Sequence, residues 1–225
     1  SVDGALNDPV RGYLTALSDA IRERGIAIGG ARSDTGARVD ALFHTMSPPL
    51  REILPAFEKK SQNQIGEILL KTLGLERTGA GTADSGLAVV RRQLLAWGAD
   101  SDGFSAHDGS GLSRLNYVSP RTIVRVLERM RGDSAYSAFP AALPIAGVDG
   151  TIRARMKGGP AEGNVRAKTG SVQRARSLSG YVTTADGREL VFSFLCNGFM
   201  TPAEEVEAAQ DSIATWLAGA RFGDR

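Results

Sequence analysis

The stretch that most constrains how this chain can fold lies between residues 165 and 197, where a Lys-Thr-Gly tripeptide precedes two β-rich runs. The two runs flank Ala185-Asp186-Gly187, and an Asp-Gly pair in such a position is typical of a β-hairpin. Lys168, Thr169 and Gly170 place a cation, a hydroxyl and an unobstructed backbone side by side. Ahead of a hairpin, this arrangement predicts an edge strand beside a cleft, where Gly170 lets a substrate backbone approach closely. A lysine in a solvated turn is the alternative.

The composition is that of an ordinary globular protein, with 42% hydrophobic and 23% charged residues in a chain of 225. This length suits one large domain or two small ones. No apolar run reaches the about 18 residues of a membrane span. No signal-peptide pattern opens the sequence, so we expect any export signal to have been removed or to lie outside these residues. The single cysteine, Cys196, excludes an internal disulfide and a cysteine-based metal cluster. We expect neither a metal nor a cofactor.

Basic residues are concentrated between residues 151 and 177, although the net charge of the whole chain is only +2. A local positive excess beside a cleft would attract an anionic ligand, and a solvated basic face is the alternative. Aromatic residues do not alternate with these bases, as a groove for single strands would require, so we expect no nucleic-acid partner. The bases are Arg153, Arg155, Lys157, Arg166, Lys168, Arg174 and Arg176, against the single acid Glu162.

Apolar spacings of three and four residues predict several helices. The first begins at Pro9 behind Asp8 and ends at Gly25, and a last helix opens at residues 201–205, where acids occupy its first turn. From Val206, Ile213 and Leu217 we expect packing of this last helix onto the sheet. Further helices are predicted at 50–59, 64–73 (ending at Gly74), 83–97 and 121–130, and short strands at 26–28 and 41–46.

Ser61 stands directly ahead of the helix predicted from Gln64 and permits two interpretations. It could be the N-cap of that helix, with Gln64 three residues on completing a capping box. Alternatively, its hydroxyl and the amide of Asn63 point into the cleft from the side opposite Lys168. His107-Asp108, in a loop rich in Gly and Ser, resembles half of a catalytic triad, but adjacent residues rarely face each other usefully. His44 is expected to be a packed or surface histidine.

Three stretches together resemble the serine D-alanyl-D-alanine carboxypeptidases of peptidase family S13, the class C low-molecular-mass penicillin-binding proteins. They are 47–50 with Lys60-Ser61-Gln62-Asn63, the loop 108–114, and Lys168-Thr169-Gly170-Ser171 with its Leu-Ser-Gly-Tyr-Val. The resemblance implies an α+β, penicillin-recognising transpeptidase or serine β-lactamase-like fold, an antiparallel sheet flanked by helices. It further implies that residues 1–225 are the C-terminal part of the catalytic domain, and that the fold is incomplete in this chain.

The same resemblance assigns roles to individual residues. Ser61 and Asn63 correspond to the family's Ser-x-Asn motif, with Gln62 in a middle position that often holds Asp. Ser61 would relay a proton to the leaving amine, and Asn63 would bind the substrate's peptide carbonyl. Lys168 would help to keep the field of this relay positive and, with Thr169, would bind the terminal carboxylate. The backbone N–H of Ser171 would form part of the oxyanion hole. Arg114 and Gln173 would surround the acidic side chain of the stem peptide, typically diaminopimelate, since a guanidinium suits a carboxylate.

One motif of the family is absent: no serine in this sequence is followed by lysine three residues later. In the family this Ser-x-x-Lys carries the nucleophile and its base. We therefore expect the chain to act with an upstream part of the same protein, possibly a separate chain, and to be inactive alone. The implied function is a periplasmic or otherwise extracytoplasmic serine D,D-carboxypeptidase/endopeptidase. It would act on peptidoglycan stem peptides through an acyl-enzyme and bind β-lactam antibiotics. A serine β-lactamase or esterase of the same fold, and a non-catalytic cell-wall-binding protein, are the alternatives.

Overall fold

The computed structural model describes residues 8–30 and 46–223, and the chain divides into two compact units, Ser1–Ser47 and Pro48–Arg225. In the first unit, helix α1 (Pro9–Glu23) begins as predicted, because the Asp8 carboxylate accepts a hydrogen bond from the Arg11 N–H at 2.9 Å. The strand predicted at 26–28 is wrong, since no described strand pairs with this segment. The strand predicted at 41–46, with His44, falls outside the described residues except for Met46.

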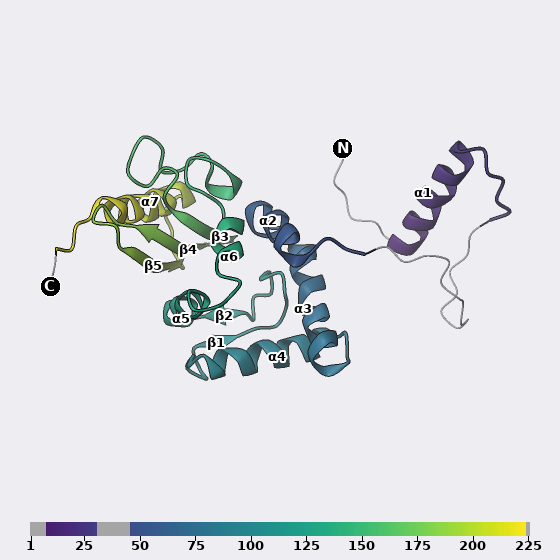
Figure 1. The fold of residues 1–225 in the computed structure, drawn as a ribbon, viewed down its shortest axis with the longest axis horizontal. Helices are drawn as coiled ribbons and strands as arrows, with labels where there is room; N and C mark the ends of the chain where they lie inside the picture. Colours follow the sequence, from purple (N-terminus) through teal and green to yellow (C-terminus); the bar gives the residue numbers. More distant parts are fainter. Residues whose placement is uncertain (1–7, 31–45, 224–225) are drawn as a thin grey trace. The chain divides into compact units, whose positions relative to one another are not determined.

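The second unit contains an antiparallel sheet in the order β3-β4-β5 (Figure 1). Its strands are β3 (Arg166–Val172), β4 (Ala175–Thr183) and β5 (Glu189–Asn197). The β4–β5 hairpin predicted at Asp186-Gly187 is confirmed, with Gly187 at φ +82° in the left-handed region that favours glycine. Strand β3 lies at the edge, also as predicted. Its first residue is bridged to Ile145, and no described strand pairs with its outer side beyond that point.

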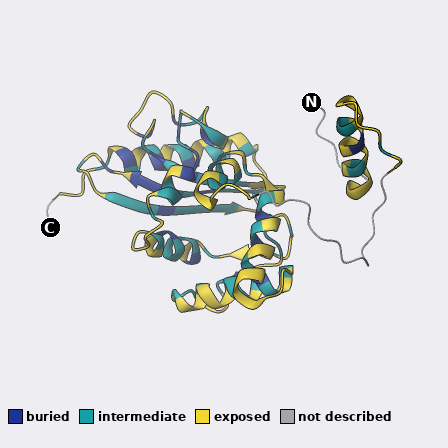
Figure 2. Ribbon diagram, turned by 45° about the vertical axis from the view of Figure 1, so that its right-hand side comes forward, coloured by how far each residue is buried: buried dark blue, intermediate teal, exposed yellow. Residues whose placement is uncertain are grey.

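Helices cover both faces of this sheet, as Figures 1 and 2 show. On one face, Leu178 and Val182 of β4 pack in a core with Ala214 and Ala218 of α7 (Ala203–Gly219). On the other face, Tyr181 packs in a cluster with residues of α5 (Pro120–Met130) and α6 (Ala138–Ala142). The alternation along β4 is that of a strand buried on both sides.

The residues with which α7 packs were predicted only in part. Leu217 contacts the core as predicted, but Ile213 is 47% exposed. The helix instead turns Ala214 and Ala218 toward the sheet, because small side chains let helix and sheet approach closely.

The second unit opens with the helices α2 (Leu50–Lys60), α3 (Asn63–Thr78) and α4 (Ala83–Ala96). The predicted end of α3 at Gly74 is wrong, and the helix continues to Gly79, which adopts φ +77°. Gly74 serves packing instead, because a Cβ there would lie 2.3 Å from the Ser85 hydroxyl of α4. A Cβ on Gly86 would likewise lie 2.1 Å from the Leu70 carbonyl oxygen, so both glycines let α3 and α4 touch closely.

Short elements complete the unit. Strands β1 (Phe104–Ser105) and β2 (Tyr117–Val118) pair across the loop between them, and η1 (Gly150–Ile152) is a single helical turn ahead of β3. The sequence did not indicate the β1–β2 pairing or α6. The fold is nonetheless α+β with an antiparallel sheet flanked by helices, as expected. Within the described ranges, no helix is both long and apolar enough to cross a bilayer.

Candidate active site

Ser61 lies at the junction of α2 and α3 in an unusual backbone conformation. It closes α2 with φ 55° and ψ 52°, the left-handed region that costs a non-glycine residue about 1–2 kcal/mol. The capping interpretation is wrong, because the N-cap of α3 is Gln62 and no side chain caps it. The Ser61 hydroxyl instead accepts a hydrogen bond from the Lys168 ammonium, with Nζ 2.8 Å from Oγ. Residues with a strained backbone cluster at functional sites, so a strained serine that contacts a cation is a candidate functional residue.

Lys168 reaches Ser61 from the edge strand β3, across 107 residues of sequence. Its Nζ also donates to the carbonyl oxygen of Thr169 at 2.9 Å. Burial lowers the pKa of Lys168, and the negative charge of Glu58 acts in the opposite direction. The predicted convergence of residues 61 and 168 is therefore present, and the lysine is a half-buried cation rather than one in a solvated turn.

The other residues of the two motifs lie around this contact. Asn63 is exposed at the first position of α3, next to Ser61. Gly170 is half-buried in β3, where a Cβ would lie 2.4 Å from the Ser177 hydroxyl of β4, so a larger residue would require that side chain to move. Ser171 follows as an exposed residue on the same edge strand.

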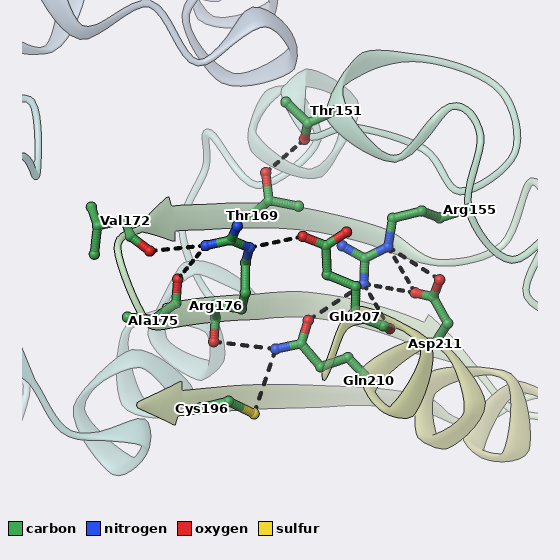
Figure 3. A network of polar contacts seen from close by, with 10 residues as sticks. All are labelled: Thr151, Arg155, Thr169, Val172, Ala175, Arg176, Cys196, Glu207, Gln210 and Asp211. Atoms are coloured by element: carbon green, nitrogen blue, oxygen red, sulfur yellow. Dashed lines mark hydrogen bonds and ion pairs between the residues drawn. The ribbon is translucent and has the colours of Figure 1, made fainter. Parts of the chain in front are cut away.

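Thr151 is a residue of the site that the sequence did not indicate. The Thr169 hydroxyl donates to the Thr151 hydroxyl, with the two oxygens 2.8 Å apart (Figure 3). Thr151 lies in η1 and is exposed, so two hydroxyls stand side by side at the open edge of β3. Two adjacent hydroxyls are suited to bind a carboxylate.

A framework of polar contacts behind β3 fixes the positions of these groups, as Figure 3 shows. Arg155, which follows η1, binds the carboxylate of Asp211 on α7 with Nη2 2.7 Å from Oδ1. Arg176 of β4 donates to the Val172 carbonyl at the end of β3 and pairs with Glu207 of α7 at 2.9 Å. The segment that bears Thr151 and the strand that bears Lys168 are therefore both anchored to the same helix.

Arg114 and Gln173, predicted to act together, do contact each other. The Arg114 Nη2 donates to the Gln173 Oε1 at 3.3 Å, which joins the loop 107–114 to the β3–β4 hairpin. Both side chains are exposed. A guanidinium is suited to bind a carboxylate through two parallel hydrogen bonds.

The loop that carries Arg114 is built around Asp108 rather than around a catalytic dyad. The Asp108 carboxylate accepts hydrogen bonds from the backbone N–H groups of Gly111 and Ser113, both at 2.7 Å, and from the Asn116 amide. Partial burial opposes ionisation, but these hydrogen bonds together hold the pKa of Asp108 below its ordinary value. Asp108 therefore orders the loop. His107 contacts Ser105 instead, with Nε2 3.0 Å from Oγ.

The same loop is pressed against α3 at a close backbone contact. A Cβ on Gly109 would lie 2.3 Å from the Gly66 carbonyl oxygen. The Glu67 carboxylate of α3 accepts the N–H groups of Gly109 and Ser110 at 3.1 and 2.9 Å. The loop is thus fixed to the helix that begins at Asn63.

No group of three or more His, Cys, Asp or Glu side chains within residues 8–30 and 46–223 has the arrangement of a metal site.

Comparison with known proteins identifies the family. The family model described as D-Ala-D-Ala carboxypeptidase 3 (S13) matches residues 2–220. This chain belongs to the S13 family. A D-alanyl-D-alanine carboxypeptidase of an Actinomadura species is 41% identical over 207 residues, which cover 89% of this chain and 38% of the relative.

Solved structures agree with this assignment. Penicillin-binding protein 4 of Haemophilus influenzae, solved in complex with a β-lactam, superimposes with a TM-score of 0.81 at 28% identity. The match covers 96% of this S13 chain and 53% of that protein. The extended-spectrum β-lactamase TLA-1, at 17% identity and a TM-score of 0.56, shares the fold over 75% of this chain and 61% of its own. These structures confirm the expected fold family. The chain spans only about two fifths of the length of the Actinomadura relative.

Proposed function

We propose that this S13 chain forms one side of the active site of a serine D,D-carboxypeptidase/endopeptidase. The substrates would be D-Ala-D-Ala termini or cross-linked stem peptides of peptidoglycan, which places the protein outside the cytoplasm. The observation that carries the proposal is the 2.8 Å contact between the Lys168 ammonium and the Ser61 hydroxyl. The Actinomadura and Haemophilus relatives, a D-alanyl-D-alanine carboxypeptidase and a penicillin-binding protein, support it.

In the proposed reaction, Ser61 passes a proton to the leaving amine. When the tetrahedral intermediate collapses to the acyl-enzyme and its C–N bond breaks, the amine nitrogen takes the Ser61 hydroxyl proton, and Lys168 returns a proton to Oγ along the existing hydrogen bond. Burial lowers the pKa of Lys168, which makes the ammonium a better proton donor than an exposed lysine. The geometry thus supplies an acid for the step that releases the product.

Binding of the substrate would use the open edge of β3. Lys168, Thr169 and Thr151 offer an ammonium and two adjacent hydroxyls for the terminal carboxylate. Asn63 would bind a peptide carbonyl, and the Ser171 N–H would contribute to the oxyanion hole. Gly170 leaves room for the substrate backbone. Arg114, held by Gln173, would bind a carboxylate on the stem-peptide side chain.

The nucleophile has to come from outside residues 1–225, because no Ser-x-x-Lys occurs in them. We propose that an upstream part of the same protein, in the same chain or as a separate one, docks against this unit. Two features support docking. The outer edge of β5 has no partner strand among the described residues, and unpaired edges favour association. A cavity of about 310 Å³ between α2, α3, α4 and the loop at 106–109 is lined mainly by apolar residues, including Phe57, Leu69, Leu73 and Val90.

Labelling with a fluorescent penicillin tests this proposal. The isolated 225-residue chain is expected to stay unlabelled, whereas a protein that contains both this chain and the Ser-x-x-Lys part is expected to form a stable acyl adduct. Labelling of the isolated chain would contradict the assignment of the nucleophile. Rapid loss of the label from the larger protein would indicate a β-lactamase instead.

A further inference from the structure

An ion pair that belongs to none of the motifs joins two sides of the candidate site. The Lys59 ammonium contacts the Asp149 carboxylate, with Nζ 2.5 Å from Oδ2. Lys59 lies in the last turn of α2, two residues before Ser61. Asp149 directly precedes η1, two residues before Thr151. The two side chains are 20% and 36% exposed, so the pair is partly shielded from water. It therefore links the segment that leads to Ser61 with the segment that carries Thr151.

Asp149 is also bound to the segment that pairs with the start of β3. Its other carboxylate oxygen, Oδ1, accepts a hydrogen bond from the Ile145 N–H at 2.9 Å. Ile145 is bridged to Arg166, the first residue of β3. The neighbouring Pro144 carbonyl oxygen accepts the Ala167 N–H at 3.0 Å. One carboxylate thus holds α2 through Oδ2 and the segment beside β3 through Oδ1.

Backbone packing at Gly150 brings the same segments together. Gly150 is the first residue of η1 and adopts φ +63°, in the left-handed region that favours glycine. A Cβ there would lie 2.7 Å from the Pro144 Cβ and 3.1 Å from the carbonyl oxygen of Lys59. The end of α2 thus lies directly against the start of η1. Loss of the ion pair would loosen an interface at which two backbones are in close contact.

We propose that Lys59 and Asp149 are positioning residues that hold the two ends of the substrate site at a fixed separation. One end is Ser61, where the leaving amine would take its proton, and the other is the pair of hydroxyls at Thr151 and Thr169. The inference rests on the proposed function, since it concerns a substrate that reaches both ends at once. A peptide with a free terminal carboxylate does so, whereas its C-terminal amide lacks the charged group for the second end. Because a misplacement of about 1 Å can cost on the order of 100-fold in rate, the ion pair matters most for the peptide that is held at both ends.

A double-mutant cycle on the unfolding of the 225-residue chain tests whether the ion pair joins the two segments. Lys59→Met, Asp149→Asn and the double variant are compared with the wild type. Asparagine keeps an oxygen for the Ile145 N–H, so the cycle isolates the contact with Lys59. Each single variant is expected to raise the unfolding equilibrium constant about two- to fivefold, as for an ion pair partly open to water. The double variant is expected to raise it no further than the larger single effect. Effects that multiply would overturn the inference.

Peptide hydrolysis by the protein that also contains the Ser-x-x-Lys part tests the positioning role. The substrates are a peptide that ends in D-Ala-D-Ala and the same peptide with a C-terminal amide. Lys59→Met and Asp149→Asn are both expected to lower kcat/KM for the free acid by about tenfold, and for the amide by less. Lys59→Arg is expected to restore most of the loss, because a guanidinium also pairs with a carboxylate. Arg131→Met is the matched control, since it removes an ion pair with Glu189 that joins the end of α5 to the start of β5. It is expected to leave both values unchanged.

The two variants of the pair also separate positioning from an effect of charge. Lys59→Met removes a cation and Asp149→Asn removes an anion, so a purely electrostatic influence on the substrate carboxylate would change kcat/KM in opposite directions. Opposite changes, or equal losses for the acid and the amide, would overturn the inference. Absence of hydrolysis of both peptides by the wild type would contradict the proposed function and with it the positioning role. The unfolding cycle would still decide whether the ion pair joins the two segments.

Discussion

Ser61 combines a strained backbone with a hydroxyl that meets a cation. The left-handed conformation allows α2 to end and α3 to begin two residues later, and it turns the side chain toward Lys168 instead of toward the first turn of α3. A glycine would adopt this backbone without penalty. The presence of serine at such a position is explained if its hydroxyl is needed, because stability alone would favour glycine.

Two substitutions at Ser61 separate the strain of its backbone from the role of its hydroxyl. Ser61→Gly is expected to be more stable than Ser61→Ala by about 0.5–1 kcal/mol, because it relieves the left-handed strain, after allowing for the greater freedom of glycine in the unfolded chain. Both are expected to reduce acylation or deacylation in the complete protein by about 100-fold or more, since both remove the proton relay. Denaturant unfolding and acylation kinetics measure the two effects. Equal stability of the two variants would show that the backbone is unstrained.

Thr151 offers a test of the proposed carboxylate site. Thr151→Ala removes the partner hydroxyl of Thr169 and, with it, about 0.5–1.5 kcal/mol of binding, which corresponds to at most about a tenfold rise in KM for a peptide with a free terminal carboxylate. A peptide with a C-terminal amide serves as the control, and its weaker turnover is expected to be unaffected. Equal losses for the two peptides would place Thr151 outside the carboxylate site.

At the scale of elements, close backbone contacts hold the site loop and its supporting helices together. Gly66 and Gly109 join α3 to the loop 106–116, and Gly74 and Gly86 join α3 to α4. Helix α3 therefore begins at the candidate active site and continues into a tightly packed hairpin with α4. The position of Asn63 depends on this packing as much as on the local sequence.

The close contact between α3 and α4 predicts that a methyl group added at Gly86 destabilises the fold. Gly86→Ala would place a Cβ 2.1 Å from the Leu70 carbonyl oxygen, a backbone atom that cannot move aside cheaply. We expect a loss of about 1–3 kcal/mol in the free energy of unfolding. Gly132→Ala is the control, since the nearest atom to its Cβ would be 3.8 Å away, and we expect a change of less than about 0.5 kcal/mol. Thermal or denaturant unfolding of both variants decides whether the two helices pack as described.

At the scale of the whole molecule, the unit from Pro48 to Arg225 leaves the outer edge of β3 open beyond its first residue, as far as the described residues show. Helix α7, on one face of the sheet, holds the end of this strand in place. Arg155 and Arg176 reach α7 through Asp211 and Glu207, and these contacts fix η1 and the end of β3. The site therefore lies on a rigid support. In the function proposed above, the nucleophile would be brought to this edge by the upstream part of the protein.

The parts of the fold that the sequence predicted are those that local signals specify. Asp186-Gly187 between β-rich runs marked the hairpin, and Asp8 ahead of Pro9 marked the start of the first helix. Gly74 was misread, because a glycine that serves helix–helix packing has the same appearance in sequence as one that ends a helix. The β1–β2 pairing depends on two-residue strands joined across a loop, for which periodicity gives no signal.

The candidate site was predicted through a resemblance rather than through spacing alone. Ser61 by itself resembled a helix cap, and only the family motif paired it with Lys168. Thr151 lay in a turn with no motif, so its contact with Thr169 became visible only in three dimensions.

The most direct test of the central claim is a double-mutant cycle on Ser61 and Lys168 in the protein that includes the Ser-x-x-Lys part. The rate of acylation by a β-lactam is measured for the wild type, Ser61→Ala, Lys168→Ala and the double variant. If the hydroxyl and the ammonium act together in one cleft, the double variant is expected to lose little more than the worse single variant. Losses that multiply, as for two independent residues, would contradict the account.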